Sequence, residues 1–127
     1  ILLGALALSV AAVVSLVGNQ ALFAARDARA REEWGAAVDH ARRASALLPW
    51  SVEPLIVRGD AVARLGDRAA AIEAYRRAVA RDPRNWVAWL RLAQVASGRE
   101  RARAYARVRA LNPLARDLPG EGRAAGS

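Results

Sequence analysis

The stretch Val52–Asn85, VEPLIVRGDAVARLGDRAAAIEAYRRAVARDPRN, decides the fold, because it contains two helical segments, a turn between them and a proline that closes the unit. Gly66 predicts a left-handed stop for the first helix, and Asp67 after it is a favourable N-cap for the second. Pro83 predicts that the second helix ends at or before the preceding residue, since a residue before proline avoids the α region. The stretch therefore predicts a helix hairpin.

Small residues in this stretch stand where two antiparallel helices must approach closely. Gly59 on the first helix, with Ala71 and Ala78 on the second, predicts the contact, and Tyr75 fills the wedge beside them with its hydroxyl at the edge. Pro54 lies in the first helical turn, where its missing amide has no helical partner to lose. We expect both alanines to be nearly buried.

The proline recurs with a period of 34 residues, from Pro49 to Pro83. The stretch resembles the tetratricopeptide repeat (TPR), a helix hairpin of this length, in the spacing of its large residues, its small residues and the proline that ends the unit. The resemblance rests on Leu55, Gly59, Val62, Gly66, Asp67, Ala71, Tyr75, Ala78 and Pro83. It implies an α-solenoid that binds protein partners.

Weaker copies flank this unit, so that the resemblance covers residues 19–113. Upstream, residues 19–30 form an expected first helix that continues from the apolar head of the chain. Its second helix is indicated by Trp34, Ala37, Val38, Ala41, Ala44 and Pro49. Downstream, Asn85 is the expected N-cap of a helix that carries Trp86, Trp89, Leu92, Ala93 and Ala96. Gly98 turns the chain into a last helix, residues 99–111, with Tyr105 facing inward.

The first 25 residues carry no charged side chain, and every charge lies at or after Arg26. A helix of this length spans about 37 Å and is long enough to cross a hydrocarbon core of roughly 30 Å. A signal peptide would be shorter and would follow a basic segment, and a soluble helix that is apolar on all faces would need protein all round it. A transmembrane helix over residues 1–25 is therefore favoured.

The positive charge of the body admits two interpretations. The net charge is +8, and all 20 basic residues are arginines spread along the expected helices, which fits solvated helix faces better than a nucleic-acid or lipid partner. Arg26, Arg29 and Arg31 follow the apolar run directly, and positive charge beside a membrane helix favours the cytoplasmic side. We expect a bacterial inner-membrane protein whose repeat body is cytoplasmic.

The residue inventory disfavours catalysis. The chain has no cysteine, so disulfides and thiol nucleophiles are excluded, and its single histidine, His40, has no acidic partner at helical spacing. Glu32 and Glu33 are adjacent and cannot converge on one bond, so we interpret them as first-turn acids of a helix. No phosphate loop or metal-ligand spacing is present. We expect no catalytic residue, cofactor or metal.

Four tryptophans in this length are candidates either for partner anchors or for packing between repeats, and packing is favoured. Trp86 and Trp89 share a helix face, with Trp89 at a core position. Trp50 lies at a unit boundary. Trp34 is the expected interfacial residue near the membrane surface.

The first helix of each hairpin should line the concave face of the solenoid. In the central unit and the next one, the residues on that stripe are Glu53, Ile56, Asp60, Arg64, Leu90 and Gln94, and Arg26 extends it upstream. A mixed-charge groove suits a peptide better than nucleic acid, which needs a continuous basic lane. The TPR carboxylate clamp implies Lys and Asn where Asp60 and Ile56 stand, so no preference for a free peptide C-terminus is expected.

An apolar helix, an arginine-rich junction and an Ala/Arg-rich repeat stretch with "SALLPWSVEP", "RDPRNWVAWLRLA" and "ALNPLA" also resemble the C-terminal end of bacterial O-antigen ligase-like membrane proteins. That resemblance implies a lipid-linked oligosaccharide transferase whose catalytic residues lie outside this chain, which begins inside an apolar run and reads as a fragment. Two functions thus stand: a membrane-anchored interaction scaffold, or a non-catalytic part of such an enzyme.

Together these features predict an all-α chain in three parts. These are a transmembrane helix over residues 1–25, TPR-like antiparallel hairpins in a short right-handed solenoid over residues 26–116, and a disordered tail over residues 117–127.

Overall fold

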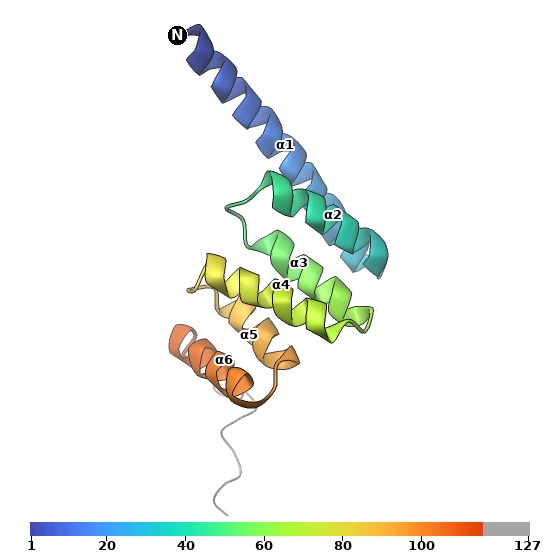
Figure 1. The fold of residues 1–127 in the computed structure, drawn as a ribbon, viewed down its shortest axis with the longest axis vertical. Coiled ribbons are helices and arrows are strands. Elements are labelled where there is room, and N and C mark those ends of the chain that lie inside the picture. The colour runs from blue at the N-terminus through green and yellow to red at the C-terminus, as the bar shows by residue number, and fades with distance from the viewer. Residues whose placement is uncertain (116–127) are drawn as a thin grey trace, which may run out of the picture.

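The computed structural model describes residues 1–115, and every regular element within that range is an α-helix, as the sequence predicts. The expected disordered tail lies outside the described residues. Three antiparallel hairpins stack along one axis (Figure 1), in the order α1 (Leu2–Ala30) with α2 (Trp34–Leu47), α3 (Glu53–Arg64) with α4 (Arg68–Arg81), and α5 (Trp86–Val95) with α6 (Gly98–Leu111).

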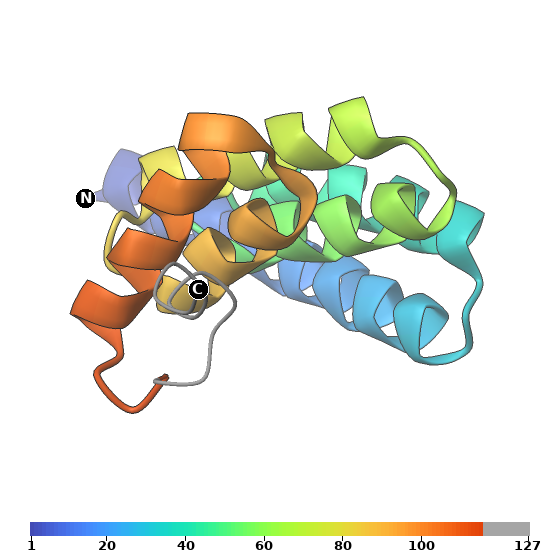
Figure 2. The ribbon, with the colours of Figure 1, turned by 90° about the horizontal axis from the view of Figure 1, so that it is seen from below.

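The stack has an inner and an outer row of helices. Helix α3 packs against both α1 and α5, whereas the backbones of α2, α4 and α6 are not in close contact with one another in the described part of the chain. A surface ion pair of 2.8 Å between Arg76 and Glu100 joins α4 to α6. Figure 2 looks along this stack, with the two helices of each hairpin side by side. The helices of the inner row, α1, α3 and α5, are close to one another, and those of the outer row, α2, α4 and α6, are spread apart. The inner row therefore lines the concave side, which is the arrangement of a solenoid.

The central hairpin packs as its small residues predict. Ala71 and Ala78 are fully buried, and Tyr75 is only 2% exposed. A Cβ atom added to Gly59 would lie 2.4 Å from Cε1 of Tyr75, so the ring occupies the space that any larger residue would need. Gly59 and Tyr75 thus set how closely α3 and α4 cross.

The turns of the two later hairpins also follow their sequence signals. Gly66 ends α3 with φ +86°, and Gly98 has φ +56° where α6 begins. The carboxylate of Asp67 caps α4 by accepting a 2.9 Å hydrogen bond from the backbone N–H of Ala70. The side chain of Asn85 caps α5 in the same manner, with the N–H of Ala88 at 3.1 Å.

Helix α1 has two halves with different surroundings. From residue 1 to residue 17 nearly every side chain is exposed, and the first buried residue is Gly18. From Gly18 onward, one stripe of the helix is buried against α2 and α3. Its residues are Gly18, Ala21, Leu22, Ala25 and Ala28. The helix as a whole is long and apolar enough to cross a membrane by length and composition. The projecting half (residues 1–17) and the repeat half are continuous (Figure 1).

Two sequence interpretations were wrong, one for Glu32 and Glu33 at the α1–α2 turn and one for the packing of Trp50. Glu32 and Glu33 precede α2 instead of occupying its first turn, and Glu32 takes the left-handed conformation with φ +61°. Trp50 is 64% exposed and so does not pack between repeats, whereas Trp89 is half-buried against the main core. Trp34 follows the end of α1, about 18 Å beyond Gly18 at the usual helical rise, and its expected place near a membrane surface stays a prediction.

Candidate functional site

The concave side carries an open hollow of about 570 Å³ between the inner helices. Its walls combine charged, amide and aromatic side chains, which are Arg29, Glu32, Trp34, Asp60, Ala63, Arg64, Tyr75, Arg91, Gln94 and Val95. All three hairpins contribute to this lining, so the hollow exists only in the assembled stack.

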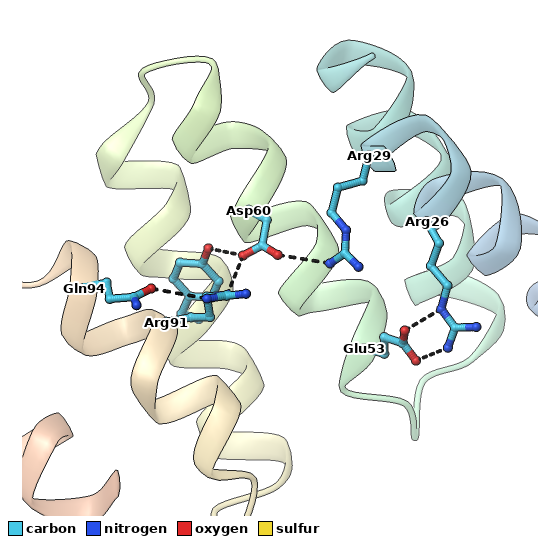
Figure 3. A network of polar contacts seen from close by, with 7 residues as sticks. Arg26, Arg29, Glu53, Asp60, Arg91 and Gln94 are labelled. Atoms are coloured by element: carbon cyan, nitrogen blue, oxygen red, sulfur yellow. Dashed lines mark hydrogen bonds and ion pairs between the residues drawn. The ribbon is translucent and has the colours of Figure 1, made fainter. Parts of the chain in front are cut away.

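Asp60 is the centre of the polar network in this hollow. Its Oδ1 accepts a 2.7 Å hydrogen bond from the hydroxyl of Tyr75, and its Oδ2 accepts a 3.1 Å hydrogen bond from Nη1 of Arg29. Nε of Arg91 forms an ion pair with Oδ1 at 3.1 Å. Figure 3 shows Asp60 between the two arginines, which reach it from α1 and α5. One carboxylate therefore links the three hairpins.

The electrostatics of this centre favour a fixed protonation state. Burial of the phenol, followed by its hydrogen bond to the Asp60 carboxylate, raises the pKa of Tyr75 above its ordinary value. Tyr75 consequently stays a neutral hydrogen-bond donor throughout the physiological range. The side chain of Asp60 is only 16% exposed, so the two arginines cover the carboxylate that holds them.

The hollow is bordered by two further interactions. The guanidinium of Arg64 lies over the Trp34 ring, 5.0 Å from its centroid, and this stacking joins α3 to the start of α2. The side chain of Gln94 accepts a 3.4 Å hydrogen bond from Nη1 of Arg91. These contacts hold the long side chains in place before any ligand arrives.

The expected groove residues divide into two groups. Asp60, Arg64 and Gln94 line the hollow. Glu53 instead accepts a two-pronged pair of hydrogen bonds from Arg26, seen on the right of Figure 3.

The two apolar members of the stripe lie deeper than the groove prediction implies. Ile56 is 9% exposed within the core, and Leu90 is half-buried against it.

Sequence reasoning missed five polar or aromatic members of the hollow: Arg29, Glu32, Trp34, Tyr75 and Arg91. Arg29 follows Arg26 by three residues on the same helix, so the spacing rule that extended the stripe upstream would have reached it. Arg91 lies three residues before Gln94 and follows from the same rule.

The polar side chains of the hollow are ionic and hydrogen-bonding groups. Within residues 1–115, no group of three or more His, Cys, Asp or Glu side chains is placed to hold a metal ion. The hollow offers guanidinium and amide donors at an open surface. Such a surface recognises hydrogen-bond acceptors and anions.

Comparison with known proteins identifies the repeat. Residues 52–95, from the residue before α3 to the end of α5, match the family described as Tetratricopeptide repeat. The fold is similar to that of the Arabidopsis OM64 TPR domain, with a TM-score of 0.76, 19% sequence identity, and coverage of 81% of this chain and 88% of that one. No curated protein sequence matches the chain. The chain thus contains a tetratricopeptide repeat unit, and its fold is that of a TPR domain.

Proposed function

We propose that this TPR-fold chain is a membrane-anchored scaffold, which holds a peptide segment of a protein partner in the concave hollow and performs no chemistry of its own. TPR folds are in general protein-binding modules, and the hollow is the feature of this one that suits a ligand. The observation that carries the proposal is the convergence of three hairpins on Asp60, because it keeps the walls of the hollow in one arrangement.

The charge of the lining favours a peptide that carries acidic side chains. Arg29, Arg64 and Arg91 contribute three positive charges, against the two carboxylates of Glu32 and Asp60. Asp60 is already engaged by two arginines and a phenol, which leaves the unused guanidinium N–H groups as the main donors facing a ligand. A carboxylate on the ligand would accept charge-assisted hydrogen bonds from them.

Preorganisation supports binding at this position. A partner that had to order several free arginine side chains would lose roughly 0.5–1.5 kcal/mol for each one. Here the ion pairs and the stacking of Arg64 on Trp34 order those side chains in the free protein. The hollow is open along one side, which suits an extended or helical peptide rather than a small substrate that must be shielded from water.

We infer that the apolar part of α1 anchors the chain in a bacterial inner membrane, with the repeat body on the cytoplasmic side. Arg26, Arg29 and Arg31 give that side its positive charge. All three form ion pairs in the folded chain, but the topology rule counts basic residues and gives acidic ones little weight. The relation to O-antigen ligase-like proteins stays a prediction from sequence.

Fluorescence anisotropy of the full chain in nanodiscs tests the groove. The probes are labelled, amidated decapeptides that alternate alanine with glutamate, glutamine or arginine, together with the glutamate peptide bearing a free carboxyl end. We expect the glutamate peptide to bind at least tenfold more tightly than the arginine peptide, with no gain from the free carboxyl.

Variants locate that binding. Arg64→Gln should weaken the glutamate peptide severalfold, whereas Arg43→Gln, an exposed position on the outer helix α2 outside the hollow, should leave it unchanged. Equal binding of the glutamate and arginine peptides, or equal effects of the two substitutions, would contradict the proposed site.

A further inference from the structure

The turn between α2 and α3 lies beside the projecting half of α1. Trp50, at this turn, shares an open apolar hollow of about 520 Å³ with side chains that face it from α1, including Leu6, Val10 and Val14. Trp50 is 64% exposed, although indole is among the largest apolar groups a protein has. An exposed tryptophan beside an exposed apolar helix forms a continuous apolar surface.

Close packing at Gly18 brings the turn to this position. A Cβ atom at Gly18 would lie 2.7 Å from Leu48, so the absence of a side chain there lets Leu48 pack directly on α1, where it is 3% exposed. Two hydrogen bonds stabilise the turn, one of 3.0 Å from the Ser51 N–H to the Leu48 carbonyl and one of 3.0 Å from Arg81 of α4 to the Ser51 carbonyl. The packing of Leu48 and these two hydrogen bonds together hold Trp50 beside α1.

The sequence around Trp50 is unusually free of charge. Residues 44–52 form the longest uncharged stretch after Arg26, and the next residue, Glu53, is paired with Arg26. Three other turns in the described body carry charged side chains, such as Glu32 between α1 and α2, Asp67 between α3 and α4, and Asp82 between α4 and α5. The α2–α3 turn, like the short α5–α6 turn, has no charged side chain of its own to desolvate.

Helix length places this turn at a membrane surface. The exposed apolar residues 1–17 of α1 span about 26 Å, slightly less than a hydrocarbon core of roughly 30 Å. An α1 that fills the core brings Gly18, and with it Leu48, to the boundary between hydrocarbon and headgroups. Trp50 faces Val14 and Val10, about 6 and 12 Å along α1 from Gly18, so its ring lies on the hydrocarbon side of that boundary. Trp34, at the other end of the repeat half, stays in water.

We propose that Trp50 is an interfacial anchor, inserted beside α1 at the boundary between the headgroups and the acyl chains, so that the α2–α3 turn is a second contact of the chain with the membrane. Indole suits this layer because its rings are apolar and its N–H needs a polar partner. Two contacts hold the repeat stack at a fixed inclination to the bilayer, which one helix alone would not do. This inference rests on the membrane anchoring proposed above.

Tryptophan fluorescence of the full chain in vesicles of phosphatidylcholine and phosphatidylglycerol tests the position of Trp50. Lipids brominated in the upper part of the acyl chain should quench part of the emission, more strongly than lipids brominated at the end of the chain. Trp50→Phe should remove most of that quenching, and the matched variant Trp34→Phe should remove none. Both substitutions keep an aromatic ring, and circular dichroism verifies that each variant is folded.

The outcomes separate this inference from the anchoring itself. A chain that fails to float with the vesicles would overturn the anchoring proposal. A chain that floats, but whose lipid quenching survives Trp50→Phe, would overturn only the role of Trp50. If Trp50 is shielded both from brominated lipid and from aqueous acrylamide, a protein helix covers the hollow and the lipid assignment is wrong.

Discussion

The hydroxyl of Tyr75 on α4 donates a 2.7 Å hydrogen bond to Oδ1 of Asp60 on α3, so the residue that separates the two helices also bonds them. The ring fills the space above Gly59 while its polar end reaches the concave surface. Core packing and the charged lining of the hollow therefore share a single side chain. Changes in either are expected to affect the other.

Removing the Asp60 carboxylate should destabilise the chain far more than removing the Tyr75 hydroxyl. Asp60→Ala leaves Arg29, Arg91 and Tyr75 without their acceptor, and we expect a loss of about 2–3 kcal/mol in the free energy of unfolding. Tyr75→Phe removes one hydrogen bond, with an expected loss of about 1 kcal/mol. Denaturant unfolding measures both, with Asp39→Ala on the exposed side of α2 as the near-neutral control. Equal losses for all three would show that Asp60 does not link the hairpins.

The raised pKa of Tyr75 predicts loss of stability at alkaline pH. Because the pKa is higher in the folded than in the unfolded chain, the contribution of this group is complete below the unfolded value of about 10 and is lost as pH rises through the folded value. The unfolding free energy of wild type should therefore fall as the pH rises above about 10, and the fall should be smaller in Tyr75→Phe. Ultraviolet titration in a Tyr105→Phe background follows Tyr75 as the single phenol. A normal titration midpoint for Tyr75 would contradict its burial.

The sequence predicts those features that depend on one residue and its chain neighbours. Gly66, Asp67 and Pro83 each restrict the backbone locally, and the structure has its turn, cap and helix end at these positions. The small residues Gly59 and Ala71 could be assigned to the helix contact because the repeat spacing fixes the register of α3 against α4.

The site was only partly predictable, because its members meet through tertiary contacts. Asp60 could be placed on the concave stripe, but its partners Arg29 and Arg91 lie 31 residues before and after it and reach it only when the hairpins stack. Ile56 satisfied the same spacing rule and yet belongs to the core. Residues spaced by three and four include side chains that line the groove and side chains that are buried beneath it. Spacing alone does not distinguish these two kinds of position.

Replacing Gly59 by alanine should disturb the central crossing despite the better helix propensity of alanine. The new Cβ would meet the Tyr75 ring at 2.4 Å, and overpacking of this kind costs about 1–3 kcal/mol. Gly35→Ala in α2 is the matched control, because its added Cβ would meet nothing within 4 Å, and it should be neutral or stabilising by up to about 1 kcal/mol. Thermal unfolding compares the two. If Gly59→Ala were as stable as Gly35→Ala, α3 and α4 could not cross as closely as the structure has them.

The α1–α2 turn has the same hydrogen bonds as the α3–α4 turn, but with a residue poorly suited to it. At one turn the N–H of Glu33 bonds the Ala28 carbonyl at 2.8 Å, and at the other the N–H of Asp67 bonds the Val62 carbonyl at 2.9 Å. The residue before each bond donor is left-handed, Glu32 with φ +61° and Gly66 with φ +86°. A side chain in this conformation costs about 1 kcal/mol or more, which glycine avoids.

Exchanging the residues at these two turns should consequently have opposite effects. Glu32→Gly relieves the strained conformation but adds freedom to the unfolded chain, and we expect a net gain of about 0.5 kcal/mol in the free energy of unfolding. Gly66→Glu imposes the strain and should cost about 1–2 kcal/mol. Glu32→Gln keeps a Cβ while removing the charge, so it should leave stability within about 0.5 kcal/mol of wild type and thereby separate backbone strain from electrostatics. Urea unfolding of the three variants gives the comparison. A gain for Glu32→Gln equal to that for Glu32→Gly would assign the effect to the charge of Glu32 and overturn the strain argument.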